Sequence, residues 1–280
     1  MTDTGKLMVI ATPIGNLEDL TFRAKRVLGE VEALACEDTR HTRIIFDRYE
    51  IPKPRIMFSY HEYNEDKAAE RILGLLAEGK VVGLASNAGY PGISDPGYVI
   101  ISRAVEAGYR VEVIPGASSV PVALLASGLS TASYTFKGFP PKKPGRRNTF
   151  LQMERDLPHT LILFESPHRV GILLQSALEA LGDRRAAVCI ELTKVFEEVH
   201  HGFLSELVLK FAEKKIKGEV VVVIAGGNPK FSRQEDDEKT GWSPEFVDQV
   251  IGGLQGEPLA REPQDEYEER EKFRGELYEE

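Results

Sequence analysis

The stretch "ACEDTRHTR" (residues 35–43) places a group of charged and titratable side chains directly after a short apolar run. They are Glu37, Asp38, Arg40, His41 and Arg43. Carboxylates can accept a proton, and arginines can hold a phosphate through paired N–H donors. A solvated turn would account for a few such charges, but this many after an apolar strand favours a functional site.

Three further segments repeat the pattern of polar side chains at the end of a strand-like run. "SYHEYNE" (59–65) offers rings suited to stacking on an exposed base, at Tyr60, His61 and Tyr63. "FESPHR" (164–169) carries Glu165, His168 and Arg169. "ELTKVFEEVHHG" (191–202) carries Glu191, Thr193 and Lys194.

None of these groups has the spacing of a metal site, and none forms a persuasive Ser-His-Asp set. His200 and His201 are adjacent in a strand-like run, so their side chains point to opposite faces. Polar groups at many strand ends without a strong nucleophile fit an enzyme that positions a reactive cofactor against a substrate.

The loop "SNAGYPGISDPG" (86–97) follows the apolar run at residues 81–85 and holds three glycines and two prolines. It lacks the ending of a Walker loop and the G-x-G-x-x-G pattern. Glycine lets the backbone approach a ligand closely, and proline stiffens the path. The loop is therefore either an elaborate turn or a loop whose main-chain groups bind a ligand. "TPIGNL" (12–17) precedes a helix predicted to carry Glu18 and Asp19 in its first turn. It is either a capped helix start or, with Gly15 at the end of a strand, a point of approach for a ligand or substrate.

The elements that must position these loops alternate between strand and helix. Strands are predicted at residues 7–11, 33–36, 55–59, 81–85 and 111–114, and after a proline-rich, basic interruption at 137–147 they are predicted at 160–164, 187–191, 198–203 and 220–225. Helices are predicted at 65–79, 98–107, 167–181 and 204–213. Short loops between alternating elements imply a mostly parallel, buried sheet.

We predict an α/β protein with an N-terminal domain at 1–134, a C-terminal domain at 135–227 and a ligand cleft between them. Residues 228–280 form an acidic tail that is partly helical or disordered. The net charge of −9 belongs to this tail, because residues 229–280 hold 16 acidic and 7 basic residues. The neutral remainder can carry a basic patch. Cys36 and Cys189 lie in apolar runs and are expected to be buried thiols.

The ordered set "TPIGNLED", "CEDTRHT", "SYHEYNE", "GYPGISDPG", "PGASS", "GFPP", "ESPHR", "ELTK" and "GEVVVVI" resembles the bacterial 16S rRNA cytidine 2'-O-ribose methyltransferases. These belong to the tetrapyrrole (corrin/porphyrin) methylase superfamily, and the resemblance covers about residues 5–226. It implies a two-domain methylase fold with a mostly parallel N-terminal sheet and a mixed C-terminal sheet. It also implies S-adenosylmethionine as methyl donor, 16S rRNA of the small ribosomal subunit as substrate, and a homodimer. The residues themselves predict a cytoplasmic protein with no membrane partner, because the sequence has no long apolar run and no signal-peptide pattern.

The resemblance carries roles to individual positions of this chain. The implied donor contacts are Pro13, Gly92, Ile93, Ser94, Asp95, Ala117 and Ser118. Asp38 and Glu165 are our candidates for the base that accepts the hydroxyl proton, and Lys194 and Arg40 for steadying developing charge or phosphate. For the rRNA backbone we expect contacts from Lys142, Lys143, Arg146 and Arg147, which otherwise solubilise a linker.

This chain departs from the family pattern in the donor loop. The family usually reads Ser-Asp-Ala-Gly-Thr-Pro, whereas this chain has Asn87 and Tyr90 in place of the acid and the threonine. We hypothesise that activity survives, because the main-chain-rich "GISDPG" remains. The alternatives are a related methylase that acts on a corrin or a protein, and a donor-binding module that has lost activity. The tail is a second departure. The family often ends in a helical hairpin, whereas the tail of this chain is acidic and interrupted by prolines.

Overall fold

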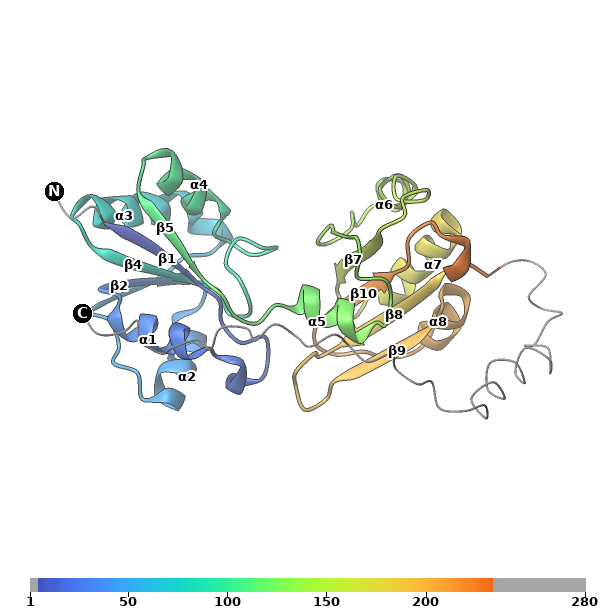
Figure 1. The fold of residues 1–280 in the computed structure, drawn as a ribbon, viewed down its shortest axis with the longest axis horizontal. Helices are drawn as coiled ribbons and strands as arrows, with labels where there is room; N and C mark the ends of the chain where they lie inside the picture. Colours follow the sequence, from blue (N-terminus) through green and yellow to red (C-terminus); the bar gives the residue numbers. More distant parts are fainter. Residues whose placement is uncertain (1–4, 234–280) are drawn as a thin grey trace, which may run out of the picture. The chain divides into compact units, whose positions relative to one another are not determined.

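The computed structural model describes residues 5–233, and Figure 1 shows how their helices and strands follow one another. Most of the predicted acidic tail, residues 234–280, lies outside the described residues. Its first residues form a short 3-10 helix, Pro229–Phe231. None of the helices between residues 5 and 233 has the length and apolar content needed to cross a bilayer.

The first sheet is entirely parallel, as predicted. Its strands are β1 (Lys6–Ile10), β2 (Ala33–Cys36), β3 (Ile56–Ser59), β4 (Val81–Ala85) and β5 (Arg110–Ile114), in the order β3-β2-β4-β1-β5. The central strands are apolar at nearly every position because helices cover both faces. The thiol of Cys36 is free and buried here, as expected.

Two pairs of helices cover the two faces of this sheet (Figure 1). α1 (Phe22–Glu30) and α2 (Thr39–Tyr49) pack on one face, and α3 (Glu65–Ala77) and α4 (Tyr98–Glu106) pack on the other. The predicted apolar stripe of α3 is buried throughout, and Gly79 ends that helix with a left-handed φ of 81°.

The strand order reverses between β1 and β4, which are neighbours in the sheet. The chain leaves β1 toward the α1 face and leaves β4 toward the α4 face. Loops that diverge in this way open a crevice at the carboxyl ends of the strands. Two backbone hydrogen bonds tie the loops together at this point, Thr12 N–H to Gly89 O at 2.9 Å and Gly89 N–H to Thr12 O at 3.0 Å.

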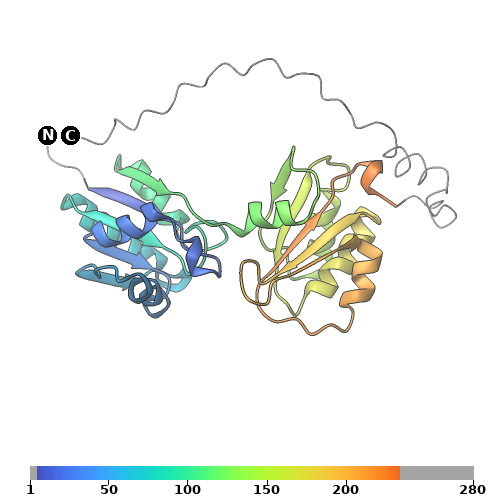
Figure 2. The same cartoon turned by 60° about the horizontal axis from the view of Figure 1, so that its bottom comes forward.

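The second sheet is mixed, as predicted. Its strands are β6 (Tyr134–Phe136), β7 (Thr160–Glu165), β8 (Arg185–Ile190), β9 (Glu198–Phe203) and β10 (Val220–Ile224), in the order β6-β7-β10-β8-β9. Only the β6–β7 pair is parallel. α6 (Pro144–Gln152), α7 (Val170–Leu181) and α8 (Leu204–Phe211) cover one face, where Figure 2 shows α8 in orange, and α5 (Ser119–Ala126) packs on the other.

Several elements differ from the sequence expectations. Glu18 and Asp19 lie in a separate 3-10 helix, Leu17–Asp19, and α1 begins only at Phe22 after the Thr21 cap. The segment read as an interruption at 137–147 contains the start of α6, because Pro144 is well suited to a first helical turn. α5 precedes the predicted boundary at residue 135 yet packs on the second sheet, so the two-domain division stays a prediction.

Candidate functional site

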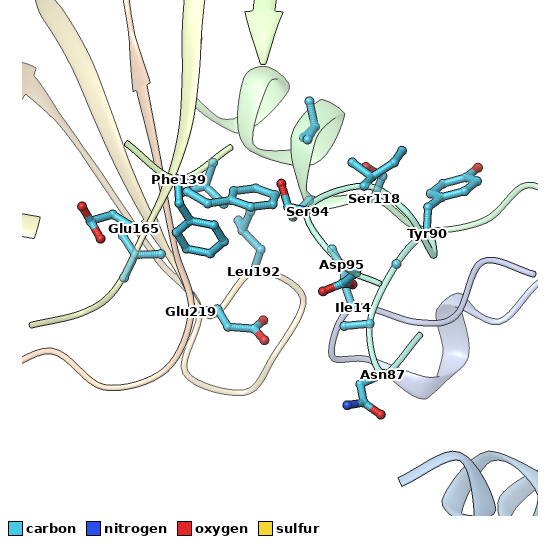
Figure 3. Close-up of a pocket in the computed structure, with 18 of the residues that line it drawn as sticks. Ile14, Asn87, Tyr90, Ser94, Asp95, Ser118, Phe139, Glu165, Leu192 and Glu219 are labelled. Carbon is cyan, nitrogen blue, oxygen red and sulfur yellow. The ribbon is translucent and has the colours of Figure 1, made fainter. Parts of the chain in front are cut away.

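A pocket of about 400 Å³ lies at the reversal point of the first sheet. Its lining residues come from the loops after β1, β2, β4 and β5 and from strand ends and loops of the second sheet, and Figure 3 shows most of their side chains. The labelled ones are Ile14, Asn87, Tyr90, Ser94, Asp95, Ser118, Phe139, Glu165, Leu192 and Glu219. Its volume lies in the range of small-molecule and cofactor sites.

The loop after β4 is held in one conformation by its own backbone. Gly92 N–H donates to Pro96 O at 3.1 Å, and Gly97 N–H donates to the Glu65 carboxylate at 3.1 Å. Gly97 has a φ of 143°, and a Cβ there would lie 2.7 Å from Gly92 N. Ser94 also adopts a left-handed φ, 59°, which is uncommon for a residue with a side chain. Such backbone strain is typical of functional loops.

The two departures from the family pattern both line the pocket. The Tyr90 hydroxyl accepts a hydrogen bond from Gly116 N–H at 3.0 Å, so its ring joins this loop to the loop after β5. In Figure 3 the hydroxyl points away from Asp95. Asn87 N–H donates to Glu37 Oε2 at 3.1 Å, while Asn87 Oδ1 is buried and has no partner among the described residues.

The structure brings four of the seven implied donor contacts to the pocket. They are Ile93, Ser94, Asp95 and Ser118. Pro13 is a buried residue of the loop after β1 that does not line the pocket, and Gly92 lies within the turn that Pro96 closes. Ala117 lines a second, more open hollow together with Asp19 and Thr193.

Of the four predicted catalytic residues, Glu165 lines the pocket. Its Oε1 accepts from Arg169 Nε at 2.8 Å and from Ser166 N–H at 2.7 Å, and Arg169 also forms an ion pair with it. Figure 3 shows the carboxylate pointing away from Asp95. Glu165 is thus already paired with a cation inside the pocket wall, and its predicted role as the base stays untested.

Asp38 and Arg40 are not among the lining residues. Asp38 caps α2 by accepting from Arg40 N–H at 2.8 Å, and its carboxylate pairs with the Arg40 guanidinium at 2.8 Å. These hydrogen bonds lower the pKa of Asp38 to about 2. The geometry therefore favours a capping pair, and the predicted catalytic roles of both residues stay untested.

Lys194 lies in the loop after β8 and bridges two carboxylates, Glu191 at 2.8 Å and Glu219 at 3.2 Å. The loop contacts the turn after β1, where Asn16 N–H donates to Thr193 Oγ1 at 3.1 Å. Gly15 is required at that contact, because a Cβ would collide with the Lys194 side chain. Lys194 does not line the pocket, but it is paired with Glu219, which does. Its predicted role in steadying developing charge or phosphate stays untested.

Two expectations about RNA contacts need correction. Arg147 is 7% exposed and donates to Ser176 Oγ and to Lys142 O, so it joins α6 to α7 instead of facing solvent. Tyr60 is 1% exposed and donates to Glu65, so its ring offers no face for stacking, whereas Tyr63 is 94% exposed.

Sequence reasoning named Glu165 of the second sheet but missed the other residues that this sheet contributes to the pocket. Phe139 and Phe164 form an edge-to-face pair with ring centres 5.6 Å apart, and Leu192 and Glu219 complete that side. Phe139, Leu192 and Glu219 lie in the segments "GFPP", "ELTK" and "GEVVVVI", which carry the resemblance to the family. Between residues 5 and 233, no group of three or more His, Cys, Asp or Glu is arranged to hold a metal ion.

Comparison with known proteins identifies the family. The profile of the family described as Tetrapyrrole (Corrin/Porphyrin) Methylases matches residues 6–208. The chain belongs to this family. Solved members share the fold at low sequence identity: a diphthine synthase (TM-score 0.61, 16% identity, 79% of this chain and 90% of that one) and a cobalt precorrin-4 methyltransferase (0.60, 16%, 79% and 94%).

Sequence relatives are much closer. A Halalkalibacterium halodurans protein named Ribosomal RNA small subunit methyltransferase I is 42% identical over 83% of this chain and 80% of its own length. Proteins of the same name from Bacillus subtilis (40%, 86% and 80%) and Thermotoga maritima (40%, 79% and 99%) are similar. This tetrapyrrole methylase therefore matches most of the length of each of these relatives.

Proposed function

We propose that the protein transfers a methyl group from S-adenosylmethionine to the ribose 2'-hydroxyl of a decoding-centre cytidine in 16S rRNA. The observation that carries this proposal is a ligand pocket at the sheet's reversal point in a chain 42% identical to a Ribosomal RNA small subunit methyltransferase I. One structural relative, a uroporphyrin-III C-methyltransferase from Thermus thermophilus, is described as complexed with S-adenyl homocysteine. The small-subunit context, a homodimer and a cytoplasmic location belong to the same proposal.

The lining of the pocket suits this donor. When bound, S-adenosylmethionine supplies a methyl group on a positively charged sulfur. Three carboxylates that line the pocket, those of Glu37, Asp95 and Glu219, complement a positive charge. The rings of Phe139 and Phe164 offer apolar surface to an adenine. Asn87 Oδ1, a buried acceptor without a partner in the described part of the chain, can take a donor from a ligand.

The chain's own residues act mainly by positioning. The loop after β4, closed by Gly92 and Pro96 and anchored by Glu65, fixes the side chains of Ser94 and Asp95 at the pocket. Holding the reacting groups in line removes entropy from the barrier and accounts for a large share of the rate enhancement.

The rRNA backbone is proposed to contact Lys142, Lys143 and Arg146, which are exposed before and at the start of α6. Replacing all three with alanine should flatten the dependence of log affinity on log salt, because each phosphate contact releases a counterion. The buried Arg147 remains unchanged in this variant. A slope equal to that of the wild type would reject the contact.

The deciding experiment incubates the full chain with labelled S-adenosylmethionine and small ribosomal subunits from cells lacking this modification, and maps the labelled nucleotide. A 2'-O-methylcytidine in the decoding centre is the expected product. Label at another nucleotide would contradict the cytidine assignment, and label in a corrin or a protein would favour a related methylase. Donor binding without any transfer would favour a module that has lost activity.

A further inference from the structure

Four carboxylates line the pocket, and they differ in whether a positively charged side chain is paired with them. They are Glu37, Asp95, Glu165 and Glu219. Glu165 is paired with Arg169, and Glu219 is paired with Lys194 at 3.2 Å. Both acids of the second sheet therefore have a cationic partner.

Asp95 has neither a cation nor a hydrogen-bond donor as partner anywhere in residues 5–233. Glu37, the other acid from the first sheet, accepts Asn87 N–H at 3.1 Å. Asp95 is thus the one lining acid whose side chain the described part of the protein leaves free to bond to something else.

The surroundings of Asp95, which is partly buried, raise its pKa. Burial, and then the negative charges of Glu37 after β2 and Glu219 before β10, raise the pKa of Asp95 to about 7. Lys194 does not offset this effect, because Glu191 and Glu219 share its charge. A carboxyl group that titrates near neutral pH suits proton transfer at working pH.

The backbone holds Asp95 in place. Ser94, immediately before it, has a left-handed φ of 59°, and Gly92 N–H donates to Pro96 O at 3.1 Å, which closes the turn that contains both residues. Figure 3 shows Asp95 and Glu219 facing each other across the pocket. A proton acceptor needs such a fixed position to act on a bound hydroxyl.

We propose that Asp95 is the general base, accepting the proton of the 2'-hydroxyl through its carboxylate. This inference rests on the proposed function. The 2'-oxygen forms a bond to the methyl carbon while the sulfur–carbon bond breaks and its electron pair goes to sulfur. The hydroxyl proton passes to Asp95, which afterwards releases it to solvent. Asp38 and Glu165 are less suited, because an arginine already holds each of them.

The test compares the wild type with Asp95→Asn, Asp95→Glu and the control Asp47→Asn, which removes an exposed ion pair with Lys53. Single-turnover methyl transfer to small subunits is measured at saturating donor between about pH 5.5 and 9. We expect Asp95→Asn to slow transfer about 100-fold or more, Asp95→Glu to restore part of the rate, and Asp47→Asn to match the wild type. The wild-type rate should rise with pH through an acid limb that Asp95→Asn lacks.

A second readout does not depend on activity. Calorimetric titration of the full chain with S-adenosylmethionine near pH 7, in two buffers of different ionisation enthalpy, counts the protons released. The wild type should release protons as the cationic donor favours ionised Asp95, and Asp95→Asn should release fewer. Its donor Kd should stay within about tenfold of the wild type, or about 1.4 kcal/mol.

Several results would overturn the inference. A wild-type rate and pH profile in Asp95→Asn, or equal proton release, would remove Asp95 as base. A weaker Kd with full rate at saturating donor would make it a donor contact only. If the wild type itself transferred no methyl group, the proposed function would fail together with the role of Asp95. If the wild type is active, the outcomes above test the role of Asp95 alone.

Discussion

The two sides of the pocket hold their acidic side chains differently. On the side of the mixed sheet, Glu165 and Glu219 are tied to Arg169 and Lys194. On the side of the parallel sheet, Asp95 has no such partner among the described residues. A carboxylate that is paired with a cation is less available to a ligand or a proton than an unpaired one. We therefore propose that proton transfer in the pocket depends on the loops of the parallel sheet.

Removing a cation from the mixed-sheet side should have the largest effect. Arg169→Ala leaves Glu165, which is 5% exposed, as an uncompensated buried charge. We expect the free energy of unfolding to fall by about 3 kcal/mol, as measured by urea denaturation. Arg26→Ala, which breaks an exposed pair with Glu30, is the control and should change it little. Equal effects of the two variants would contradict the contrast.

The second-largest effect is expected from a change in the backbone of the loop after β4, on the parallel-sheet side of the pocket. Gly97→Ala puts a side chain at a φ of 143° with its Cβ 2.7 Å from Gly92 N. It should cost about 2 kcal/mol of unfolding free energy and abolish donor binding. Gly74→Ala, in α3 with no atom within 4 Å of the added Cβ, should instead stabilise by about 0.5–1 kcal/mol. A Gly97 variant that binds the donor normally would show that this loop is not the binding element.

The unpaired state of Asp95 predicts a pH-dependent stability. Because its folded pKa of about 7 exceeds the ordinary 3.8, the folded protein binds more protons than the unfolded chain between these values. Its contribution to stability is therefore lost as pH rises through that window. Asp95→Asn should gain about 1 kcal/mol of unfolding free energy relative to the wild type from pH 5 to pH 8. A constant difference between the two proteins across this range would argue against the raised pKa.

An effect of similar size is predicted for Tyr90, whose ring replaces the family's threonine. Tyr90→Phe removes the acceptor of Gly116 N–H and should cost about 1 kcal/mol of unfolding free energy, because the amide loses its partner. Tyr63→Phe, at a residue that is 94% exposed, should leave stability unchanged. If both variants behaved alike, Tyr90 would not join the two loops.

Local pattern predicted much of the fold, and spatial neighbours explain what it missed. The strands β2, β4 and β9 match their predicted residues because apolar runs, turns and alternation are local signals. α5 was missed because it is apolar around much of its circumference, so no helical period marks it. Arg147 was read as a surface charge, since only the packing of α6 on α7 shows that Ser176 binds it.

The site was predicted in part for the same reason. Strand-end loops were recognisable, and Ser94, Asp95, Ser118 and Glu165 do line the pocket. The raised pKa of Asp95 was not predictable from the sequence. It depends in part on the charges of Glu37 and Glu219, which are far away along the chain. The sequence instead suggested Asp38 and Glu165 as base candidates, and each of them pairs with an arginine of its own motif in the structure.

The measurement that tests this account most directly is the titration of the Asp95 carboxyl itself. Carbon-13 NMR of the full chain labelled at aspartate carboxyls, with the signal assigned by its loss in Asp95→Asn, follows that group alone. The account predicts a midpoint near pH 7, raised by burial, Glu37 and Glu219. A midpoint near the ordinary value of 3.8 would show that Asp95 is solvated or paired like the other acids, and would contradict the contrast between the two sides.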